Sequence, residues 1–110
     1  MPEPAEFLHG FGLNQGLIFN GYSLEVSHAT HKSIKRYQEY YYEITLIFKN
    51  LGIGNYNELY NTVHNLISQQ HIIRGVRNPY RCIIDNPKQG DIIDNGDRVT
   101  FNLIGHSYRA

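Results

Sequence analysis

The sequence is short of several features that mark common functional classes. It has a single cysteine, Cys82, no tryptophan and no excess of charge, because ten Lys and Arg balance ten Asp and Glu in 110 residues. One cysteine excludes an internal disulfide framework and fits a reducing compartment. A formal net charge of zero excludes a global electrostatic attraction to nucleic acid or to an anionic membrane, so such binding depends on a local patch.

Long apolar runs are also missing. None approaches the roughly 18 to 20 residues that span a bilayer, and the stretch MPEPAEFLHGFG has acids where a signal peptide has bases. We therefore expect a soluble protein that is cytoplasmic at synthesis and has no membrane partner.

The motifs of common enzyme classes are incomplete. Ser107 follows Gly105 and His106 as in the G-x-S-x-G nucleophile elbow, but Arg109 stands where the second glycine belongs. Cys82 lies in a strand pattern that predicts a small core residue rather than a nucleophile. These observations predict that the chain is not an enzyme and has neither a cofactor nor a small-molecule substrate.

Histidines are the only candidates for metal ligands. The set would be His28 and His31, joined by one of His64, His71 and His106. A metal site needs three or four convergent ligands, and the sequence has neither an H-E-x-x-H nor a C-x-x-C pattern. Surface histidines are the simpler interpretation, so we predict no metal.

Strand periodicity is the strongest structural signal that the sequence does contain. Residues 39–49 alternate so that one face carries only large apolar or aromatic side chains, namely Tyr40, Tyr42, Ile44, Leu46 and Phe48. Shorter strand patterns occupy residues 17–19, 22–26, 72–76, 80–84, 92–93 and 99–104. The pairs Asn20-Gly21 and Asn95-Gly96 predict tight turns, whereas the polar stretch 28–36 is interpreted as a loop or a strand end.

One segment has helical periodicity. Asn55 can cap a helix with Glu58 three residues later, and the apolar stripe consists of Leu59, Val63, Leu66 and Ile67. The fold class predicted is therefore α+β: a mainly antiparallel sheet of four to six strands with one helix, at about 56–70, packed on one face. Residues 1–15 are assigned to an N-terminal arm and residues 16–110 to a single domain.

The arm contains apolar side chains at Phe7, Leu8 and Phe11. Two alternatives stay open: these side chains anchor the arm on a partner, or they pack on their own domain. In the first alternative they contribute to an assembly surface together with Tyr37 and Tyr41, because interfaces favour large side chains that also form hydrogen bonds.

Two basic segments form the second candidate site. Lys32, Lys35 and Arg36 precede a run of tyrosines, and Arg74, Arg77 and Arg81 follow the predicted helix. If the two segments meet, they form a positive surface with stacking rings, as in proteins that bind single-stranded nucleic acid. The alternative is that the tyrosines fill strand faces and that the basic residues protect strand edges.

Two family resemblances bear on function. The order from Tyr42-Glu43-Ile44-Thr45-Leu46-Ile47-Phe48 to Leu59-Tyr60-Asn61-Thr62-Val63-His64-Asn65-Leu66-Ile67 resembles the tail-completion and tail-terminator proteins of tailed bacteriophages. That resemblance implies a ring-forming structural protein of the virion. Separately, the segment from Asn78-Pro79-Tyr80 to Gly96-Asp97-Arg98-Val99-Thr100-Phe101-Asn102-Leu103-Ile104-Gly105 is similar to part of the CRISPR-RNA processing endonucleases of the Cas six type, which supports RNA binding.

The function expected from the sequence is therefore structural. The chain is predicted to oligomerise or to dock on other virion proteins, with incorporation into a virion. The alternative is a small module that binds RNA or single-stranded nucleic acid through its basic and tyrosine-rich surface.

Overall fold

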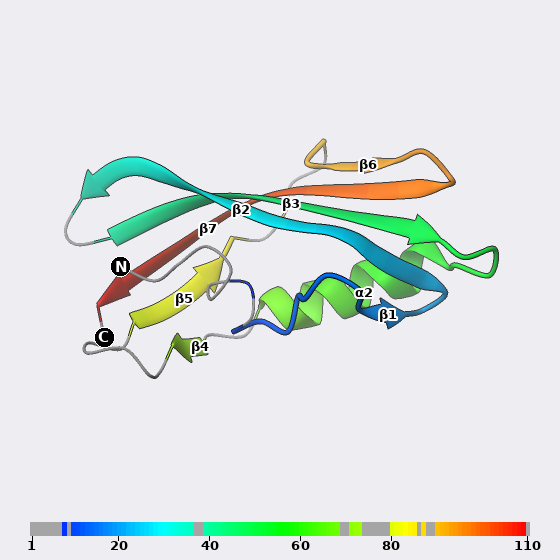
Figure 1. The fold of residues 1–110 in the computed structure, drawn as a ribbon, viewed down its shortest axis with the longest axis horizontal. Coiled ribbons are helices and arrows are strands. Elements are labelled where there is room, and N and C mark those ends of the chain that lie inside the picture. The colour runs from blue at the N-terminus through cyan, green and yellow to red at the C-terminus, as the bar shows by residue number, and fades with distance from the viewer. Residues whose placement is uncertain are drawn as a thin grey trace.

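The computed structural model describes residues 8, 10–36, 39–68, 71–73, 80–85, 87 and 90–109, with the backbone alone described at 32–36, 39–40, 71–73, 80–82 and 107–109. Within these residues the chain is an α+β protein in which one helix packs against one face of an antiparallel sheet (Figure 1). The predicted fold class is confirmed: among the described residues six strands form the main order of the sheet, and the short β6 pairs with β7 beside it.

The first hairpin joins β1 (Ile18–Phe19) to β2 (Tyr22–Arg36). Asn20 and Gly21 form its turn with φ angles of 54° and 79°, the left-handed pair that a type I′ turn requires. Asn20 also ties this turn to the helix, since its side-chain amide donates to the Glu58 carbonyl at 3.1 Å and to the Thr62 hydroxyl at 2.6 Å. The predicted hairpin is confirmed.

The longest pairing joins β2 to β3 (Glu39–Asn50). β2 continues to Arg36, so the interpretation of residues 28–36 as a loop or a strand end is wrong. The alanine and lysines in this stretch are depleted in strands in general, and the stretch is extended because it pairs with β3 along its length. Two irregularities interrupt the pairing, between Leu24 and Val26 and between Lys32 and Lys35.

The helix α2 (Tyr56–Ile67) begins at the predicted cap. The Asn55 side chain accepts a hydrogen bond from the Glu58 amide at 3.2 Å. Three members of the predicted stripe, Leu59, Val63 and Ile67, are buried, and Leu66 packs against the same core. Ser68 is the C-cap, three residues before the next strand begins.

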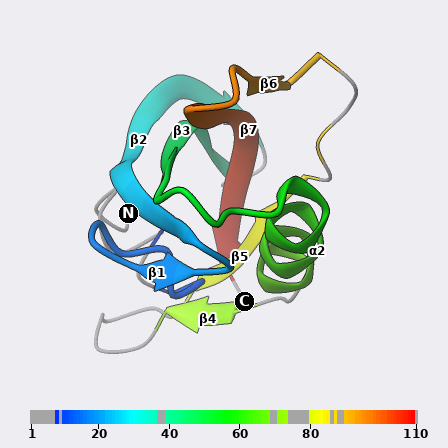
Figure 2. The ribbon, with the colours of Figure 1, turned by 90° about the vertical axis from the view of Figure 1, so that its right-hand side faces the viewer.

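Four further strands complete the sheet: β4 (His71–Ile73), β5 (Tyr80–Ile84), β6 (Ile92–Asp94) and β7 (Arg98–Arg109). The order is β1-β2-β3-β7-β5-β4, and every pairing is antiparallel. β7 pairs with β3 on one side, while on the other it pairs with β6 near its beginning and with β5 near its end. The sheet curls around α2 and the segment that precedes β1 (Figure 2).

The core lies between the concave face of the sheet, α2 and the segment before β1. Alternation along β3 and β7 is as predicted, because Tyr42, Phe48 and Phe101 are fully buried. The other buried apolar side chains are Leu8, Phe11, Leu13, Tyr22, Leu24, Ala29, Ile44, Leu46, Leu59, Val63, Ile67, Ile84, Val99 and Leu103.

Candidate functional site

The most distinctive surface is the face of the sheet turned away from α2, which we name the outer face. Its described residues come from alternate positions of four strands and include Val26, His28, Thr30, Glu43, Thr45, Ile47, Ile93, Thr100, Asn102 and Ile104. None of the described helix or N-terminal segment covers it, since these lie on the opposite face (Figure 1).

Strand register arranges these side chains in rows across the sheet. One row runs from Val26 through Ile47 and Thr100 to Ile93, from β2 to β6. Val26 and Ile93 are 37% and 47% exposed. The next row, His28, Thr45 and Asn102, is polar. The outer face therefore combines an apolar row with a polar row beside it.

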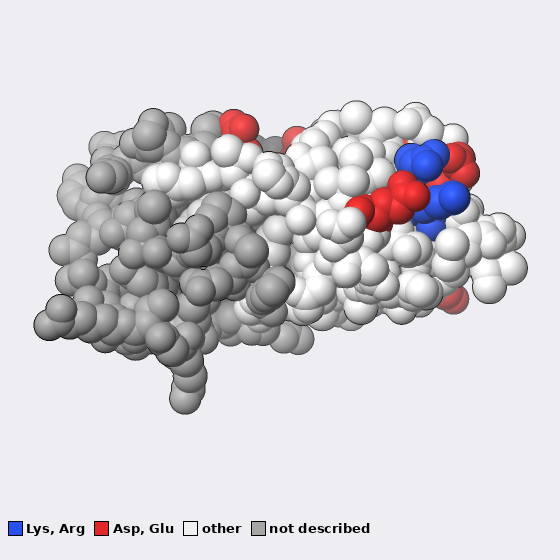
Figure 3. Space-filling view, in the orientation of Figure 1, with Lys and Arg blue, Asp and Glu red and all other residues white. Residues whose placement is uncertain are grey.

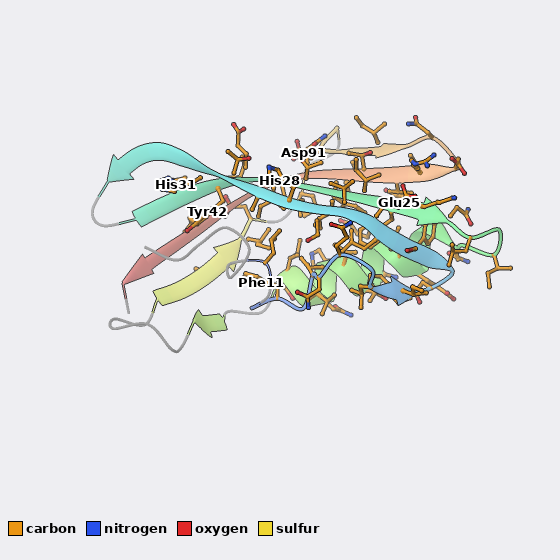
Figure 4. All side chains as sticks on the ribbon, in the orientation of Figure 1. Phe11, Glu25, His28, His31, Tyr42 and Asp91 are labelled. Atoms are coloured by element: carbon orange, nitrogen blue, oxygen red, sulfur yellow. The ribbon has the colours of Figure 1, made fainter. Side chains whose placement is uncertain are left out.

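A cleft of about 290 Å³ opens on the outer face beside the polar row. Glu43, Thr45, Asp91, Asn102 and Ile104 form its surface with Ile44 and Leu103 beneath. Asp91 precedes β6, and its carbonyl accepts a hydrogen bond from the Asn102 amide at 2.8 Å (Figure 4). The described lining has two carboxylates but no serine, cysteine, histidine or lysine. It can hold a polar or cationic group, and it lacks the nucleophile and base pair of covalent catalysis.

Charged side chains of both signs meet where β7 begins. Arg98 contacts the carboxylates of Glu25, at 3.1 Å, and of Asp97. On the face shown in Figure 3, basic and acidic side chains are interleaved at this end, and most of the remaining described surface is uncharged. These exposed ion pairs contribute little to stability, and they leave no uniform electrostatic field at this end.

The described parts of the two basic segments lie at the other end of the sheet. Lys32 and Lys35 pair with Tyr41 and Tyr40 of β3, these two pair with His106 and Ser107 of β7, and Ser107 pairs with Cys82 of β5. Arg81, adjacent to Cys82, and Arg36, adjacent to Lys35, belong to the same end. Arg74 and Arg77 lie outside the described residues. Register therefore brings the ends of β2 and β5 to the same end of one sheet, with the two strands β3 and β7 between them.

The described residues of the predicted assembly surface do not form one exposed surface. Leu8 and Phe11 are 2% and 1% exposed within this chain's own core, so neither side chain is available to a partner in this fold (Figure 4 shows Phe11 on the α2 side of the sheet). They pack there because the segment before β1 folds back under β2, where the Ser27 hydroxyl donates to the Leu13 carbonyl. Tyr41 is half-buried, with its ring 5.9 Å from that of His106. Phe7 and Tyr37 lie outside the described residues.

The histidines do not converge. His28 is exposed and its Nε2 lies 2.9 Å from the Thr30 hydroxyl, whereas His31 stacks edge-on against Tyr42 on the core side. His64 lies on α2 against Tyr60, and His106 Nδ1 is 3.7 Å from the Asp85 carboxylate. Among the residues that the structure describes, no three His, Cys, Asp or Glu side chains are grouped to hold a metal ion.

The residues of the incomplete enzyme motifs lie within strands. Ser107 pairs with Tyr40 on one side and with Cys82 on the other, so it occupies the interior of the sheet rather than a sharp turn. Cys82 itself pairs with both His71 and Ser107. A nucleophile elbow needs a strand that turns into a helix, and β7 continues to Arg109.

Two tyrosines near the first turn have perturbed acidity. Burial raises the pKa of Tyr22, and the nearby Asp94 carboxylate and Tyr56 raise it further. Burial likewise raises the pKa of Tyr56, followed by Asp94 and Tyr60. Both phenols therefore stay neutral at physiological pH, and neither is suited to act as a general base there.

The part of the outer face that β2 contributes does not follow from the sequence pattern, because residues 28–36 are interpreted there as a loop or a strand end. Val26 and Thr30 favour strands, but the stretch also contains alanine and lysine, which are depleted in strands, and apolar residues do not alternate with polar ones along it.

Comparisons of the chain with models of protein families, with curated proteins and with solved structures found no match. The described helix is too short and too polar to cross a membrane.

Proposed function

We propose that this chain is a non-enzymatic structural protein that assembles with copies of itself through the outer face. The observation that carries the proposal is the row formed by Val26, Ile47, Thr100 and Ile93 across four strands. These β-branched side chains, exposed at Val26 and Ile93 and partly exposed at Ile47 and Thr100, form a largely apolar strip that a second surface can cover.

Burial of this strip supplies the driving force. Fully burying one Val or Ile side chain stabilises by roughly 1.5 to 3 kcal/mol, and the half-exposed Val26 and Ile93 would contribute a fraction of this each. Ile104, 42% exposed, adds to the same face beyond the polar row. Extents of 43 and 27 Å make this side of the molecule large enough for the roughly 800 Å² per partner that a stable interface buries.

The form of assembly that the sequence pattern favours is a component of a virion or of a bacteriophage tail. This part of the proposal depends on the resemblance of β3 and α2 to tail-completion and tail-terminator proteins. Such proteins form rings, and in a ring the outer face of one copy would contact a different surface of the next copy.

A second candidate function is binding of single-stranded nucleic acid. The observation that favours it is the register that brings Lys32, Lys35 and Arg81 to one end of the sheet among tyrosines of β3. Cations that follow a phosphate backbone and rings that stack on bases are the features of such sites. Binding through phosphate contacts would weaken steeply with salt.

Light scattering of the wild-type protein at low and moderate salt, with and without a mixed-sequence single-stranded oligonucleotide, separates the two candidates. Assembly predicts a mass of several chains without oligonucleotide at both salt concentrations. A 12.8 kDa monomer whose mass rises only with oligonucleotide at low salt would replace the first proposal with the second. A monomer under all conditions contradicts both.

A further inference from the structure

The sequence contains two Asn-Gly pairs, Asn20-Gly21 and Asn95-Gly96, and each lies between two paired strands. In such a pair the glycine amide nitrogen can attack the side-chain amide carbon of the asparagine, because glycine has no Cβ to hinder the approach. The five-membered imide forms with release of ammonia, and water then opens it to aspartate or isoaspartate. The reaction needs an asparagine side chain that is free to rotate and a glycine with open space around it.

Asn20 does not meet these requirements. Its side-chain nitrogen donates to the Glu58 carbonyl at 3.1 Å and to the Thr62 hydroxyl at 2.6 Å, both on α2. The space at Gly21 is filled, since a Cβ there would lie 2.7 Å from the carbonyl atoms of Ile53. Ring closure at this pair would break both side-chain hydrogen bonds and displace a packed loop.

Asn95 meets both requirements. It is exposed, and its side chain makes no hydrogen bond, ion pair or ring contact with any residue that the structure describes. No described atom lies within 4 Å of the position of a Cβ at Gly96. The imide can therefore form at this pair without disturbing neighbouring packing.

The attacking nitrogen at this second pair already has a proton acceptor. The Gly96 amide donates to Asp94 Oδ1 at 2.8 Å, which is within the reach that general base catalysis requires. The Gly96 carbonyl accepts from the Asn50 side-chain amide at 3.3 Å, and this contact holds the glycine in place while the Asn95 side chain rotates.

We propose that Asn95 is a site of spontaneous deamidation, in which Asp94 accepts and returns the proton. The Gly96 nitrogen forms a bond to Asn95 Cγ as its proton moves to Asp94. The bond from Cγ to Nδ2 breaks as Asp94 passes that proton to the leaving nitrogen, so ammonia departs and Asp94 is again a carboxylate. The succinimide then consumes one water molecule and leaves a carboxylate at residue 95.

The product changes the charge and the geometry of the turn. A carboxylate in place of the neutral amide lies beside Asp94 and Asp97 and takes the formal net charge of the chain from zero to −1. In the isoaspartyl product the main chain runs through the former side chain, which lengthens the connection between β6 and β7 by one carbon. Because only three residue pairs join β6 to β7, this hairpin is the part of the sheet that the modification strains.

The test incubates the folded full chain at mildly alkaline pH and follows the mass gain at each Asn-Gly pair by peptide mass spectrometry. Asn20 is expected to react at least about tenfold more slowly than Asn95, because its two hydrogen bonds must break first. In concentrated guanidinium chloride, where the fold no longer holds either pair, the two rates are expected to converge. Equal rates in the folded chain, or an Asn95 that reacts only in guanidinium, would overturn the proposal.

Variants test the site and its proton acceptor. Asn95→Gln should abolish the acidic species that ion-exchange chromatography detects, because glutamine would have to close a larger ring. Asp94→Ser keeps an oxygen that can accept from the Gly96 amide but removes the carboxylate, and it is expected to slow the reaction at Asn95 at least about tenfold. Asp97→Ser is the matched control, since it removes a neighbouring carboxylate that does not accept from Gly96. An acidic species that persists in Asn95→Gln, or equal rates in the two serine variants, would contradict the proposal.

Discussion

At the scale of single residues, the turn at Gly21 shows how strongly one contact constrains the sequence. A Cβ at Gly21 would lie 2.7 Å from the carbonyl carbon and oxygen of Ile53 and 2.8 Å from the Cα of Gly54, all of them backbone atoms. The same loop is fixed by Asn50, whose side-chain oxygen accepts from the amides of Gly52 at 2.8 Å and Gly54 at 3.0 Å. The loop therefore has little freedom to move away.

Gly21→Ala is expected to destabilise the fold much more than Gly96→Ala. Both glycines have a positive φ, 79° and 81°, and each substitution incurs about 1 to 2 kcal/mol for that conformation. Only Gly21 adds a clash, since nothing lies within 4 Å of a Cβ at Gly96. Urea unfolding should show an additional loss of roughly 1 to 3 kcal/mol for Gly21→Ala. An equal loss of unfolding free energy in the two variants would show that the loop at Ile53 and Gly54 moves to make room for the methyl group.

The acidity of Tyr22 gives a prediction for alkaline pH. Its pKa is raised in the fold by burial, by Asp94 and by Tyr56, so the folded state holds this proton more tightly than the unfolded chain. The stabilisation is complete below the unfolded pKa of about 10 and is lost as pH rises through the folded pKa. Tyr22→Phe should reduce the slope of unfolding free energy against pH above about 10. An unchanged slope would show that Tyr22 does not contribute.

At the scale of elements, the features fixed by local chemistry could be predicted from the sequence. The turn at Asn20 and Gly21, the cap at Asn55 and the buried stripe of α2 each depend on residues close together in the chain. Residues 28–36 are extended because they pair with β3, and no local preference reports that pairing. The full length of β2, and with it the part of the outer face that β2 contributes, could not be predicted locally.

The cap of α2 offers a measurement at this scale. Asn55→Ala removes the acceptor of the Glu58 amide and is expected to cost about 1 kcal/mol. Asn61→Ala is the control, because Asn61 is exposed within α2 and alanine is the better helix former. Thermal or urea unfolding should therefore show that Asn55→Ala is less stable than the wild type, and that Asn61→Ala is as stable as the wild type or slightly more stable. The reverse order would contradict the assigned cap.

At the scale of the whole molecule, long-range packing decides between alternatives that the sequence left open. The sequence does not indicate whether Leu8 and Phe11 contact a partner or pack on their own domain. The structure places both in the core with Leu13. The meeting of β2 and β5 at one end likewise depends on the strand order β2-β3-β7-β5. The burial of Leu8 and Phe11 and the positions of β2 and β5 depend on contacts between segments far apart in the chain, which the local sequence pattern does not predict.

Phe11→Ala tests whether the segment before β1 belongs to the domain. Its side chain is 1% exposed, so we expect a loss of about 3 to 5 kcal/mol in unfolding free energy. The loss should be the same at low and high protein concentration, because the contact lies within one chain. Ile18→Ala, at a side chain that is 65% exposed, is the control and should cost far less. A loss that appears only at high concentration would place Phe11 at an interface between chains.

The central claim is that the outer face joins copies of this chain, and the most direct measurement is the sedimentation mass of Ile93→Lys beside that of Ile53→Lys. Ile93 lies in the apolar row, whereas Ile53 is 84% exposed in the loop before α2, away from the outer face. We predict that Ile53→Lys keeps the multimeric mass of the wild type and that Ile93→Lys falls to the 12.8 kDa monomer. A multimer that survives Ile93→Lys, or one that Ile53→Lys disrupts equally, would contradict the claim.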